Sequence, residues 1–366
     1  MTAADTDTRF MRRALRLAAR GAGRASPNPM VGAVIVAGGE IVGEGYHHGP
    51  GTAHAEIVAL ERAGDDRARG ATMYLTLEPC THYGRTPPCA PEVIAAALSR
   101  VVIASEDPNR KVAGAGVAAL RQAGIEVEVG LMRDEENRLN EAYRRYIRIG
   151  QPFVTLKIAM SLDGKIATRT GESRWITGER ARLEAHRMRR DADAVLVGVG
   201  TVIADDPALT VRHVRARRQP LCVVADSKAR TPPGAKVCAG ERPPLIAVTM
   251  EAAPRDVQAL REAGAEVLVF PHRDGKVDLA ALLQELGERD VASVLVEGGG
   301  ELIASLIERD LADKLVVFIA PKIIGGAEAP TAVEGTGVAA IEQAWPLHDV
   351  RCRRIGEDLM VEGYFR

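Results

Sequence analysis

Residues 77–89 read LEPCTHYGRTPPC and leave eight residues between Cys80 and Cys89. These two thiols could bind a metal ion, form a disulfide or be unreactive core side chains. The chain has five cysteines, and closely spaced cysteines in a reducing compartment are more often metal ligands or catalytic groups than disulfides. The other three have no partner at ligand spacing, so we expect buried or incidental thiols at Cys222, Cys238 and Cys352.

The composition is that of a globular protein. A chain of 366 residues is long enough for two ordinary domains, and 46% hydrophobic with 27% charged residues gives no sign of disorder. The net charge of −1 argues against a nucleic acid or an anionic membrane as partner. The N-terminal stretch lacks the apolar segment of a secretory signal, and no stretch approaches the roughly 20 apolar residues that span a bilayer. We therefore expect a cytoplasmic protein.

Around the two cysteines, helix and strand patterns alternate. Two β-rich runs, 31–36 and 40–47, are separated by Ala-Gly-Gly and predict a hairpin. The remaining pattern predicts helices over 8–20, 53–64 and 91–98, strands over 71–77 and 100–105, and a helix and a strand within 117–130. This order predicts a layered α/β domain.

A second domain is predicted to follow a polar helix over 134–148. That helix pattern gives way to Gly150-Gln151-Pro152 just before a new apolar strand, so we place the domains at 1–149 and 150–366. The second part has an α/β rhythm and a closing two-strand hairpin over 349–366. Its other strands are expected at 193–199, 220–226, 244–249, 265–270, 292–300 and 314–320.

His54-Ala55-Glu56 opens one predicted helix, and Pro79-Cys80 directly follows a predicted strand. With Cys89 they match the H-x-E and P-C-x(n)-C pattern of zinc-dependent nucleobase deaminases. One imidazole and two thiolates leave the fourth tetrahedral position of zinc open for water. A structural zinc site would use the same ligands.

Glu56 is predicted to be a proton shuttle. Residues two apart do not share a helix face, so Glu56 reaches the water by leaning around the first turn and is not a second ligand. A structural zinc site would leave this carboxylate without a role. Cys89 precedes Ala90-Pro91, a helix-start signal, and a helix N-terminus lowers the pKa of a thiol.

The long spacing of the cysteines is specific. Written out, the segment from Pro79 to Cys89 resembles the signature of the deaminase half of the bifunctional riboflavin-biosynthesis deaminase/reductase family, and SPNPMVG at 26–32 is similar to its substrate-side loop. The resemblance implies deamination of 2,5-diamino-6-(5-phosphoribosylamino)pyrimidin-4(3H)-one. It implies that Asn28 contacts the substrate, that zinc is held by His54, Cys80 and Cys89, and that Glu56 transfers protons. Two side chains of the insert could meet the ribose phosphate or be merely exposed: His82 and Arg85.

The second part has no G-x-G-x-x-G after its first strand. Instead VEGGGEL at 296–302 lies between a strand and a helix, where main-chain amides can approach a phosphate, although a tight structural turn would look the same. Three more motifs occur: KIAMSLDGK at 157–165, ESRWIT at 172–177 and GTVIADDPALT at 200–210. Together they resemble the reductase half of the same family, which has a dihydrofolate-reductase-like α/β fold and uses NADPH.

The resemblance implies two groups of residues in this half. Those expected to touch the cofactor are Met160, Trp175, Thr201, Asp205, Ser227, Gly299, Gly300, Glu301, Leu302, Ile303, Ala304 and Ser305. Those expected to face the substrate are Lys157, Ser173, Arg189, Leu209, Arg212 and Glu297. Arginines suit a phosphate because they can bind it through two hydrogen bonds. Arg187, Arg189 and Arg190 could instead form a solvated basic face.

The leading hypothesis is a homo-oligomeric, two-step enzyme. A cytidine-deaminase-like three-layer domain binds one zinc ion and deaminates the pyrimidine, and a dihydrofolate-reductase-like domain reduces the ribosyl side chain with NADPH. One alternative is a nucleic-acid or free-nucleobase deaminase with an accessory nucleotide-binding domain. An aromatic content of 4% argues against strand binding, which uses stacking platforms. The other alternative is a structural zinc module that carries a nucleotide-binding regulator.

Overall fold

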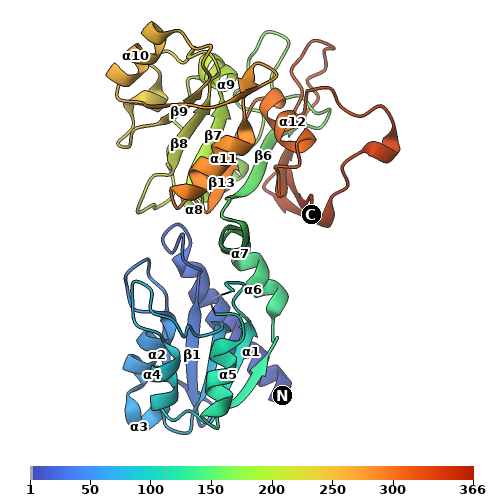
Figure 1. The fold of residues 1–366 in the computed structure, drawn as a ribbon. Coiled ribbons are helices and arrows are strands. Elements are labelled where there is room, and N and C mark those ends of the chain that lie inside the picture. The colour runs from blue at the N-terminus through green and yellow to red at the C-terminus, as the bar shows by residue number, and fades with distance from the viewer. Residues whose placement is uncertain (1–2, 111) are drawn as a thin grey trace. The chain divides into compact units, whose positions relative to one another are not determined.

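A computed structural model describes residues 3–110 and 112–366 (Figure 1). The chain forms two compact units, Met1–Gly150 and Gln151–Arg366. Each unit is a sheet with helices on its faces. Within the described residues, no helix combines the length and the apolar character needed to cross a bilayer.

The first unit is built on a five-stranded sheet of order β2-β1-β3-β4-β5. The hairpin pair β1 and β2 is antiparallel, β1 is antiparallel to β3, and the last three strands are parallel. Gly38 and Gly39, both with positive φ, make the predicted hairpin turn. The strands are β1 (Gly32–Ala37), β2 (Glu40–Tyr46), β3 (Thr72–Leu77), β4 (Arg100–Ser105) and β5 (Glu126–Val129).

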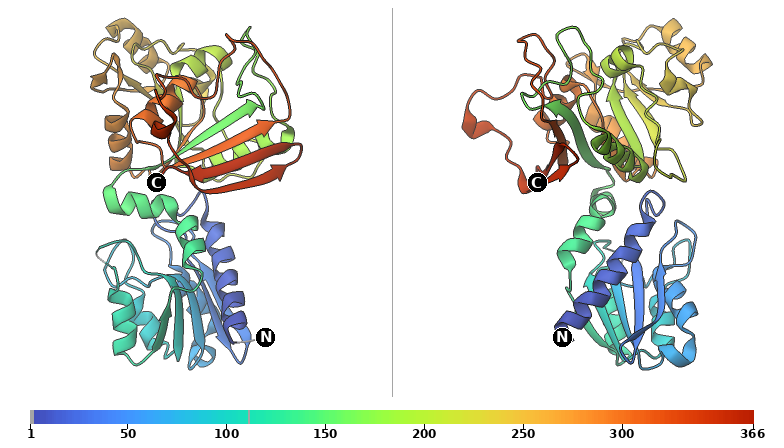
Figure 2. Two further views of the ribbon diagram at one scale, coloured as in Figure 1. Left: turned by 90° about the vertical axis from the view of Figure 1, so that its right-hand side faces the viewer. Right: turned by 180° about the vertical axis from the view of Figure 1, so that it is seen from behind.

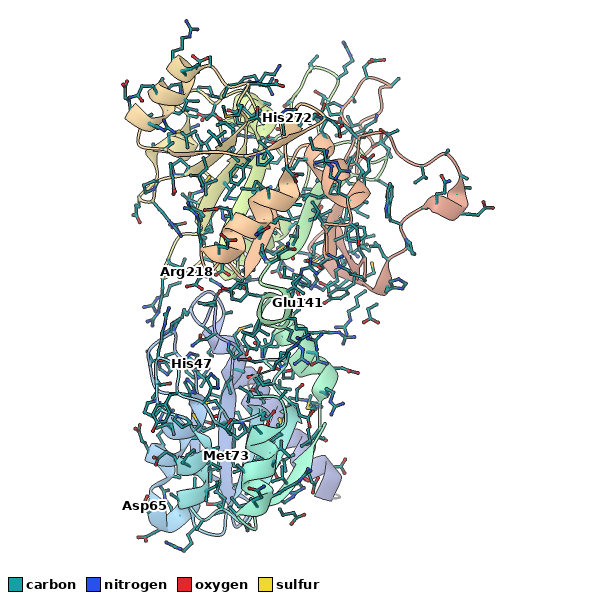
Figure 3. The ribbon with its side chains drawn as sticks, viewed as in Figure 1. His47, Asp65, Met73, Glu141, Arg218 and His272 are labelled. Carbon is teal, nitrogen blue, oxygen red and sulfur yellow. The ribbon has the colours of Figure 1, made fainter. Side chains whose placement is uncertain are left out.

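Helices cover both faces of this sheet, so the unit has three layers (Figures 1 and 2). Alternate strand residues point to opposite faces: Ile35 and Met73 pack with the α2, α4 and α5 side, whereas Val34 and Tyr74 pack against α1 (Met73 is labelled in Figure 3). The helical segments are α1 (Ala3–Ala18), η1 (Ala19–Gly21), α2 (Ala55–Ala63), α3 (Asp65–Ala68), α4 (Ala90–Ala95), α5 (Ala115–Gln122), α6 (Arg133–Leu139) and α7 (Glu141–Ile149).

Helix α2 lies unusually close to the hairpin. A Cβ atom on Gly45 would overlap the carbonyl oxygen of Ala55, and one on Gly43 would overlap that of Ala59. The buried side of α2 is itself made of alanines, Ala55, Ala59 and Ala63. This close packing fixes the start of α2, where the predicted zinc ligand His54 is the N-cap and the predicted proton-transfer residue Glu56 lies in the first turn.

The predicted single helix over 134–148 is wrong: it is two helices, α6 and α7, that meet at Asn140. The Asn140 side chain accepts from the Met30 N–H at 2.8 Å and donates to the Met30 carbonyl at 3.0 Å. It also donates to Glu136 at 2.7 Å. The break therefore places a side chain that holds the 26–32 loop, and the polar pattern of the segment gives no sign of it.

The second unit contains a nine-stranded sheet of order β10-β9-β8-β7-β13-β6-β14-β16-β15. The strands from β10 to β14 are parallel, and β16 and β15 are antiparallel additions that form the predicted C-terminal hairpin. The strands are β6 (Phe153–Ser161), β7 (Ala194–Gly198), β8 (Leu221–Ala225), β9 (Leu245–Val248), β10 (Glu266–Val269), β13 (Ser293–Val296), β14 (Lys314–Ala320), β15 (His348–Ile355) and β16 (Asp358–Tyr364), with a separate pair, β11 (His272–Arg273) and β12 (Lys276–Val277).

Helices cover both faces of this sheet as well (Figure 2). One core joins the sheet to α11 and α12 through Leu282, Leu286 and Leu306, and the opposite core joins it to α9 and α10 through Val202 and Leu260. The helical segments are α8 (Glu179–Asp191), α9 (Val199–Asp205), η2 (Lys236–Ala239), α10 (Pro254–Glu262), α11 (Leu279–Glu288), α12 (Gly300–Glu308) and η3 (Ile341–Gln343).

We expect Gly45→Ala to lower the free energy of unfolding of the first unit by about 1–3 kcal/mol, because the added methyl group displaces α2. Urea unfolding followed by circular dichroism measures this loss, and zinc content reports the accompanying movement of the first turn. Gly84→Ala is the control, since a Cβ there would meet nothing within 4 Å. Equal unfolding midpoints for the two variants would contradict the packing argument.

Candidate functional sites

Three predicted zinc ligands converge in the first unit. The ligand atoms of His54, Cys80 and Cys89 all lie within 4.8 Å of one another. His54 Nδ1 is 3.1 Å from the Cys89 sulfur and 3.6 Å from the Cys80 sulfur, so Nδ1 is the nitrogen that faces the thiols. One imidazole and two thiols are the soft-to-borderline donors that zinc prefers. The residues present therefore fit a zinc ion with an open position.

The eight-residue insert is closed at its base by the main chain. The N–H groups of Cys89 and Ala90 both donate to the Cys80 carbonyl oxygen, each at 3.1 Å. Cys89 is the N-cap of α4, as its sequence context predicts. Long spacing in sequence is thus compatible with adjacent sulfur atoms.

The two thiols have opposite electrostatic character. Hydrogen bonds from Cys89 and His54 lower the pKa of Cys80 to about 4, although burial opposes this. The hydrogen bond to Cys80, together with burial, raises the pKa of Cys89. In the absence of a metal ion the negative charge of the pair therefore lies on Cys80, and the lowering of the Cys89 pKa expected for the zinc-bound pair stays a prediction.

Glu56 is buried beside the cluster. His54 is the N-cap of α2 and lies outside the helix, whereas Glu56 is in its first turn, which lets two residues only two apart face one centre. Burial raises the pKa of Glu56 to about 7, although the neighbouring His54 ring and the Cys89 thiol act to lower it. A carboxyl group with a pKa near neutrality can both accept and release a proton.

A histidine that sequence reasoning missed lies next to the ligands. His47, labelled in Figure 3, is 3% exposed. Its Nε2 is 3.0 Å from the Asn28 amide nitrogen, and its ring contacts the His54 ring edge-on. Burial lowers the pKa of His47 to about 4, so the ring is neutral and can accept from the Asn28 amide. The structure thus brings Asn28 to the zinc cluster through His47.

The insert contributes polar groups of its own. Thr86 Oγ1 is 3.0 Å from His54 Nε2, the ring nitrogen on the far side from the thiols, and orients the imidazole. His82 is half-buried, and its Nδ1 is buried without a hydrogen-bond partner among the described residues. Arg85 is exposed on the same loop.

In the second unit, the predicted substrate residues form a buried ion cluster. The carboxylate of Glu297, which directly follows β13, is paired with both Nε and Nη2 of Arg189 from α8, the latter at 2.9 Å. Lys157 Nζ, on β6, is 3.5 Å from the same carboxylate. Burial alone would raise the pKa of Glu297, but Arg189 and Lys157 lower it to about 2.

The predicted phosphate loop adjoins this cluster. Gly298 and Gly299 both have positive φ, and a Cβ on Gly298 would lie 2.9 Å from Thr201 Oγ1 on α9. No side chain caps α12, so the N–H groups of its first turn are not taken up by a cap. Glycine and an uncapped helix start form a cradle that fits the diphosphate of NADPH. The side chains of Leu302, Ile303 and Ala304 are buried in the core, and Glu301 is paired with Lys276.

Further residues predicted to touch the cofactor or the substrate lie on segments that follow β6 and β7 or near the end of β6. Ser173 donates to Asp205 of α9 at 2.8 Å, and the exposed Trp175 ring lies 4.6 Å from the Arg182 guanidinium carbon. Met160 is near the end of β6 and packs on the core. Leu209 has a positive φ and a buried side chain, whereas Arg212 is exposed.

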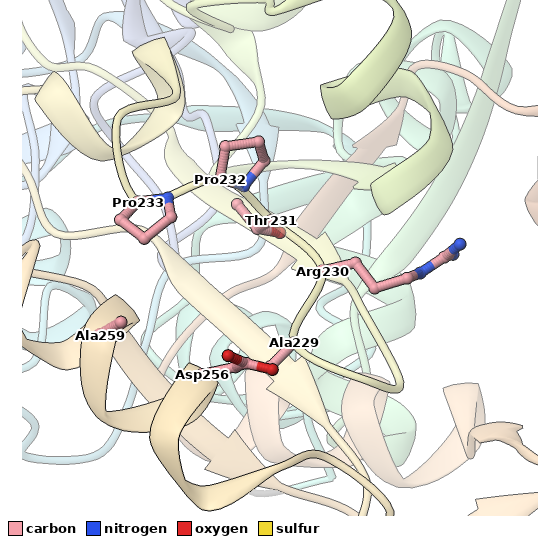
Figure 4. Close-up of a pocket in the computed structure, with 7 residues that line it drawn as sticks. All are labelled: Ala229, Arg230, Thr231, Pro232, Pro233, Asp256 and Ala259. Carbon is pink, nitrogen blue, oxygen red and sulfur yellow. The ribbon is translucent and has the colours of Figure 1, made fainter.

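Ser227 follows the end of β8. Its Oγ accepts from the Val277 N–H at 3.0 Å. Two residues further on begins a cavity of about 380 Å³, which none of the predicted residues lines (Figure 4). Its lining residues are Ala229, Arg230, Thr231, Pro232, Pro233, Asp256 and Ala259.

Comparisons with known proteins agree with both sites. Residues 4–105 match the cytidine and deoxycytidylate deaminase zinc-binding region, and residues 152–361 match the RibD C-terminal domain. The chain is 44% identical to the riboflavin biosynthesis protein RibD of Aquifex aeolicus, over 98% of both chains. It is 45% identical to that of Actinobacillus pleuropneumoniae, over 98% of this chain and 95% of the relative.

The chain belongs to the RibD family. Solved structures agree: Acinetobacter baumannii RibD superposes with a TM-score of 0.88 at 36% identity and 99% coverage of both chains. A deaminase/reductase from Thermotoga maritima gives 0.86, also at 36% identity and 99% coverage. The resemblance inferred from the sequence and the two-part fold class are therefore confirmed.

Sequence reasoning missed several residues that serve the RibD sites. His47 and Thr86 orient Asn28 and His54, and Asn140 holds the 26–32 loop. Their partners lie far off in sequence or on the main chain, so no spacing rule identifies them. The only available signal is that His47 lies just before the zinc motif.

We expect Arg189→Met to lower the free energy of unfolding of the second unit by about 3–5 kcal/mol, since it leaves the buried Glu297 carboxylate with Lys157 as its charged partner. Arg187→Met is the matched control. It removes a pair with Glu184 in which the arginine is 50% exposed, and should change the stability by less than about 1 kcal/mol. Equal losses in urea unfolding would mean that Arg189 belongs to a solvated basic face.

Proposed function

We propose that residues 1–149 remove the amino group of 2,5-diamino-6-(5-phosphoribosylamino)pyrimidin-4(3H)-one and that residues 150–366 then reduce its ribosyl side chain. The product is 5-amino-6-(5-phosphoribitylamino)uracil. As a RibD-family member, the chain is a zinc-dependent deaminase and an NADPH-dependent reductase of riboflavin biosynthesis. The observation that carries the deaminase assignment is the convergence of one imidazole, two thiols and a buried carboxyl group.

In the first step, His54, Cys80 and Cys89 would hold zinc, which supplies a water that is nucleophilic at neutral pH. Glu56 accepts a proton from that water as its oxygen attacks the amino-bearing ring carbon. Glu56 passes this proton to the ring nitrogen. It then takes the second proton from the newly added hydroxyl group and gives it to the amino group, which leaves as ammonia while the hydroxyl becomes the carbonyl group. A pKa of about 7 suits both halves of this transfer.

Substrate contacts in the first unit are assigned to three side chains. Asn28, held by the neutral His47, is placed to hydrogen-bond to the pyrimidine. The buried and unpaired Nδ1 of His82 supports a ligand contact over mere exposure, because such an atom costs about 1–3 kcal/mol without a partner. Arg85 of the same insert would meet the ribose phosphate.

In the second step, bound NADPH would supply a hydride for the anomeric carbon of the ribosyl group. The bond from this carbon to the ring oxygen breaks, and that oxygen takes a proton to become a hydroxyl group. Gly299, Gly300 and the α12 start would receive the diphosphate of NADPH, with Thr201 of α9 beside them. Asp205, at the end of α9, is also assigned to the cofactor. Further contacts are assigned to Met160, Trp175 and Ser227. Lys157 and Glu297 would face the sugar, with Ser173 near it. Arg189 holds Glu297, so the exposed Arg212 is the better candidate for the substrate phosphate.

We also propose a cytoplasmic homo-oligomer. The free thiols of Cys80 and Cys89 need a reducing compartment to bind metal. Among the described residues, large exposed apolar side chains recur between 323 and 359, including Ile341 at 91% and Val350 at 55% exposure. Strand β15 lies at the sheet edge with all but its last residue exposed, which suits pairing with a second copy.

We expect Glu56→Gln to reduce ammonia release from the phosphoribosylaminopyrimidine by about 10²–10⁴-fold while zinc content stays the same. NADPH oxidation on the already deaminated substrate should not change, because it depends on the other unit. Glu61→Gln, an exposed carboxylate on the same helix, is the control. Equal ammonia release from Glu56→Gln and wild type would overturn the proton-transfer role.

We expect Val350→Lys to shift the protein toward monomer in sedimentation velocity, because it places a charge on the exposed edge strand. Met250→Lys, another exposed apolar side chain at 83% exposure, is the control and should leave the distribution unchanged. A wild-type monomer at micromolar concentration would contradict the proposal of a homo-oligomer.

A further inference from the structure

The main chain of residues 210–212 is held by side chains from two directions. Arg189 Nη1 donates to the Thr210 carbonyl at 3.2 Å. Gln219 binds both main-chain polar groups of Val211. Its Oε1 accepts from the Val211 N–H at 2.7 Å, and its Nε2 donates to the Val211 carbonyl oxygen at 3.5 Å. The N–H of Arg212 donates to His186 Nδ1 at 3.2 Å. A surface loop seldom has four successive polar groups satisfied by side chains, so this segment is held unusually firmly.

His186 is suited to this contact. It lies on α8 three residues before Arg189, so both reach the loop from one helix face. It is 9% exposed, and its ring meets the His213 ring edge-on at 5.2 Å. Burial is the main cause that lowers the pKa of His186 to about 4. The nearby charges of Arg189, Arg212 and His213 lower it further, and the Glu297 carboxylate acts in the opposite direction. The ring is neutral at neutral pH, so Nδ1 can accept a hydrogen bond.

Only the main chain of Arg212 is held. Among the described residues, no hydrogen bond or ion pair to its guanidinium is found, and the side chain is exposed. Arg189, by contrast, is fully engaged by Glu297 and Thr210. A fixed backbone with an uncommitted guanidinium is what a phosphate-binding arginine needs, because little freedom is then lost on binding.

We infer that His186 and Gln219 are positioning residues for the reductase: they fix the 210–212 main chain so that the Arg212 guanidinium meets the phosphate of the substrate. Neither touches the substrate. This inference rests on the proposed function, in which Arg212 receives the ribose phosphate. The strength of the contact between Arg212 and the phosphate is thus set by His186 and Gln219, neither of which is among the predicted site residues.

The test compares NADPH oxidation on the deaminated phosphoribosyl substrate with that on its dephosphorylated riboside. His186→Phe keeps the ring volume and loses the acceptor, and Gln219→Leu independently frees Val211. Each variant should raise KM for the phosphorylated substrate about tenfold, the equivalent of about 1.4 kcal/mol, with kcat nearly unchanged. KM for the riboside should stay the same. His186→Asn, which keeps an acceptor, should recover part of the loss, and His213→Phe should behave as wild type.

The outcomes separate this inference from the proposed function. If Arg212→Ala leaves the preference for the phosphorylated substrate intact, the phosphate assignment fails and the inference fails with it. If Arg212→Ala removes the preference but His186→Phe and Gln219→Leu do not, only the inference fails. If the two variants raise KM equally for the phosphorylated substrate and the riboside, His186 and Gln219 have only a structural role, and the inference is overturned in this case too.

A stability measurement adds a pH signature. Because the folded-state pKa of His186 is below its ordinary value of about 6.5, the stability gained from the neutral ring is present above pH 6.5 and is lost as the pH falls toward 4. The difference in unfolding free energy between wild type and His186→Phe should therefore be larger at pH 7.5 than at pH 5.5. A difference independent of pH would show that the neutral ring is not required.

Discussion

The zinc site of the first unit depends on the hydrogen bonds that the Glu78 carboxylate accepts. Glu78 follows β3 directly and accepts four main-chain N–H groups, from Asp107, Gly114, Gly116 and Val117, at 2.8–3.2 Å. Each hydrogen bond to a charged group contributes about 1.5–3 kcal/mol, so together they fix the loop before α5 against the end of β3. Cys80 is two residues further on, and its carbonyl oxygen in turn draws in Cys89. A Cβ on Gly116 would overlap the Pro79 carbonyl oxygen, so this approach requires glycine.

The second unit also organises its site around a buried carboxylate at a strand end, but with different partners. Glu297 is satisfied by the charged groups of Arg189 and Lys157 and not by neutral amides. Removing one charged partner from a buried pair leaves an uncompensated charge, whereas losing one amide of four leaves a carboxylate that is still solvated by the others. The Glu297 carboxylate therefore depends more on the side chains of its individual partners than the Glu78 carboxylate does. The same arginine also holds the Thr210 carbonyl, which couples the ion cluster to the Arg212 loop.

Local patterns were sufficient to predict much of the fold and the metal ligands. Apolar, β-rich runs identified β1 and the parallel strands, because strands covered on both faces are apolar along their whole length, and a helical pattern identified α2. The break at Asn140 could not be predicted, since its cause is a contact with Met30, 110 residues away in sequence. His186 and Gln219 were missed for a related reason: they bind main-chain groups, and a main-chain partner leaves no mark on residue type. The cofactor and substrate roles came from the family resemblance, and they stay predictions.

Unlike the sequence, the structure shows which polar atoms already have hydrogen-bond partners. Around both sites nearly every buried polar group has a hydrogen-bond partner. This includes the four main-chain groups of residues 210–212 that side chains bind. Two buried side-chain atoms among the described residues have none: His82 Nδ1 in the insert and Asp226 Oδ1 directly before Ser227. Each unpaired atom costs about 1–3 kcal/mol unless an ordered water or a ligand supplies the missing partner. Both lie beside residues that the family resemblance assigns to ligand binding, so polar satisfaction and resemblance point independently to the same two segments.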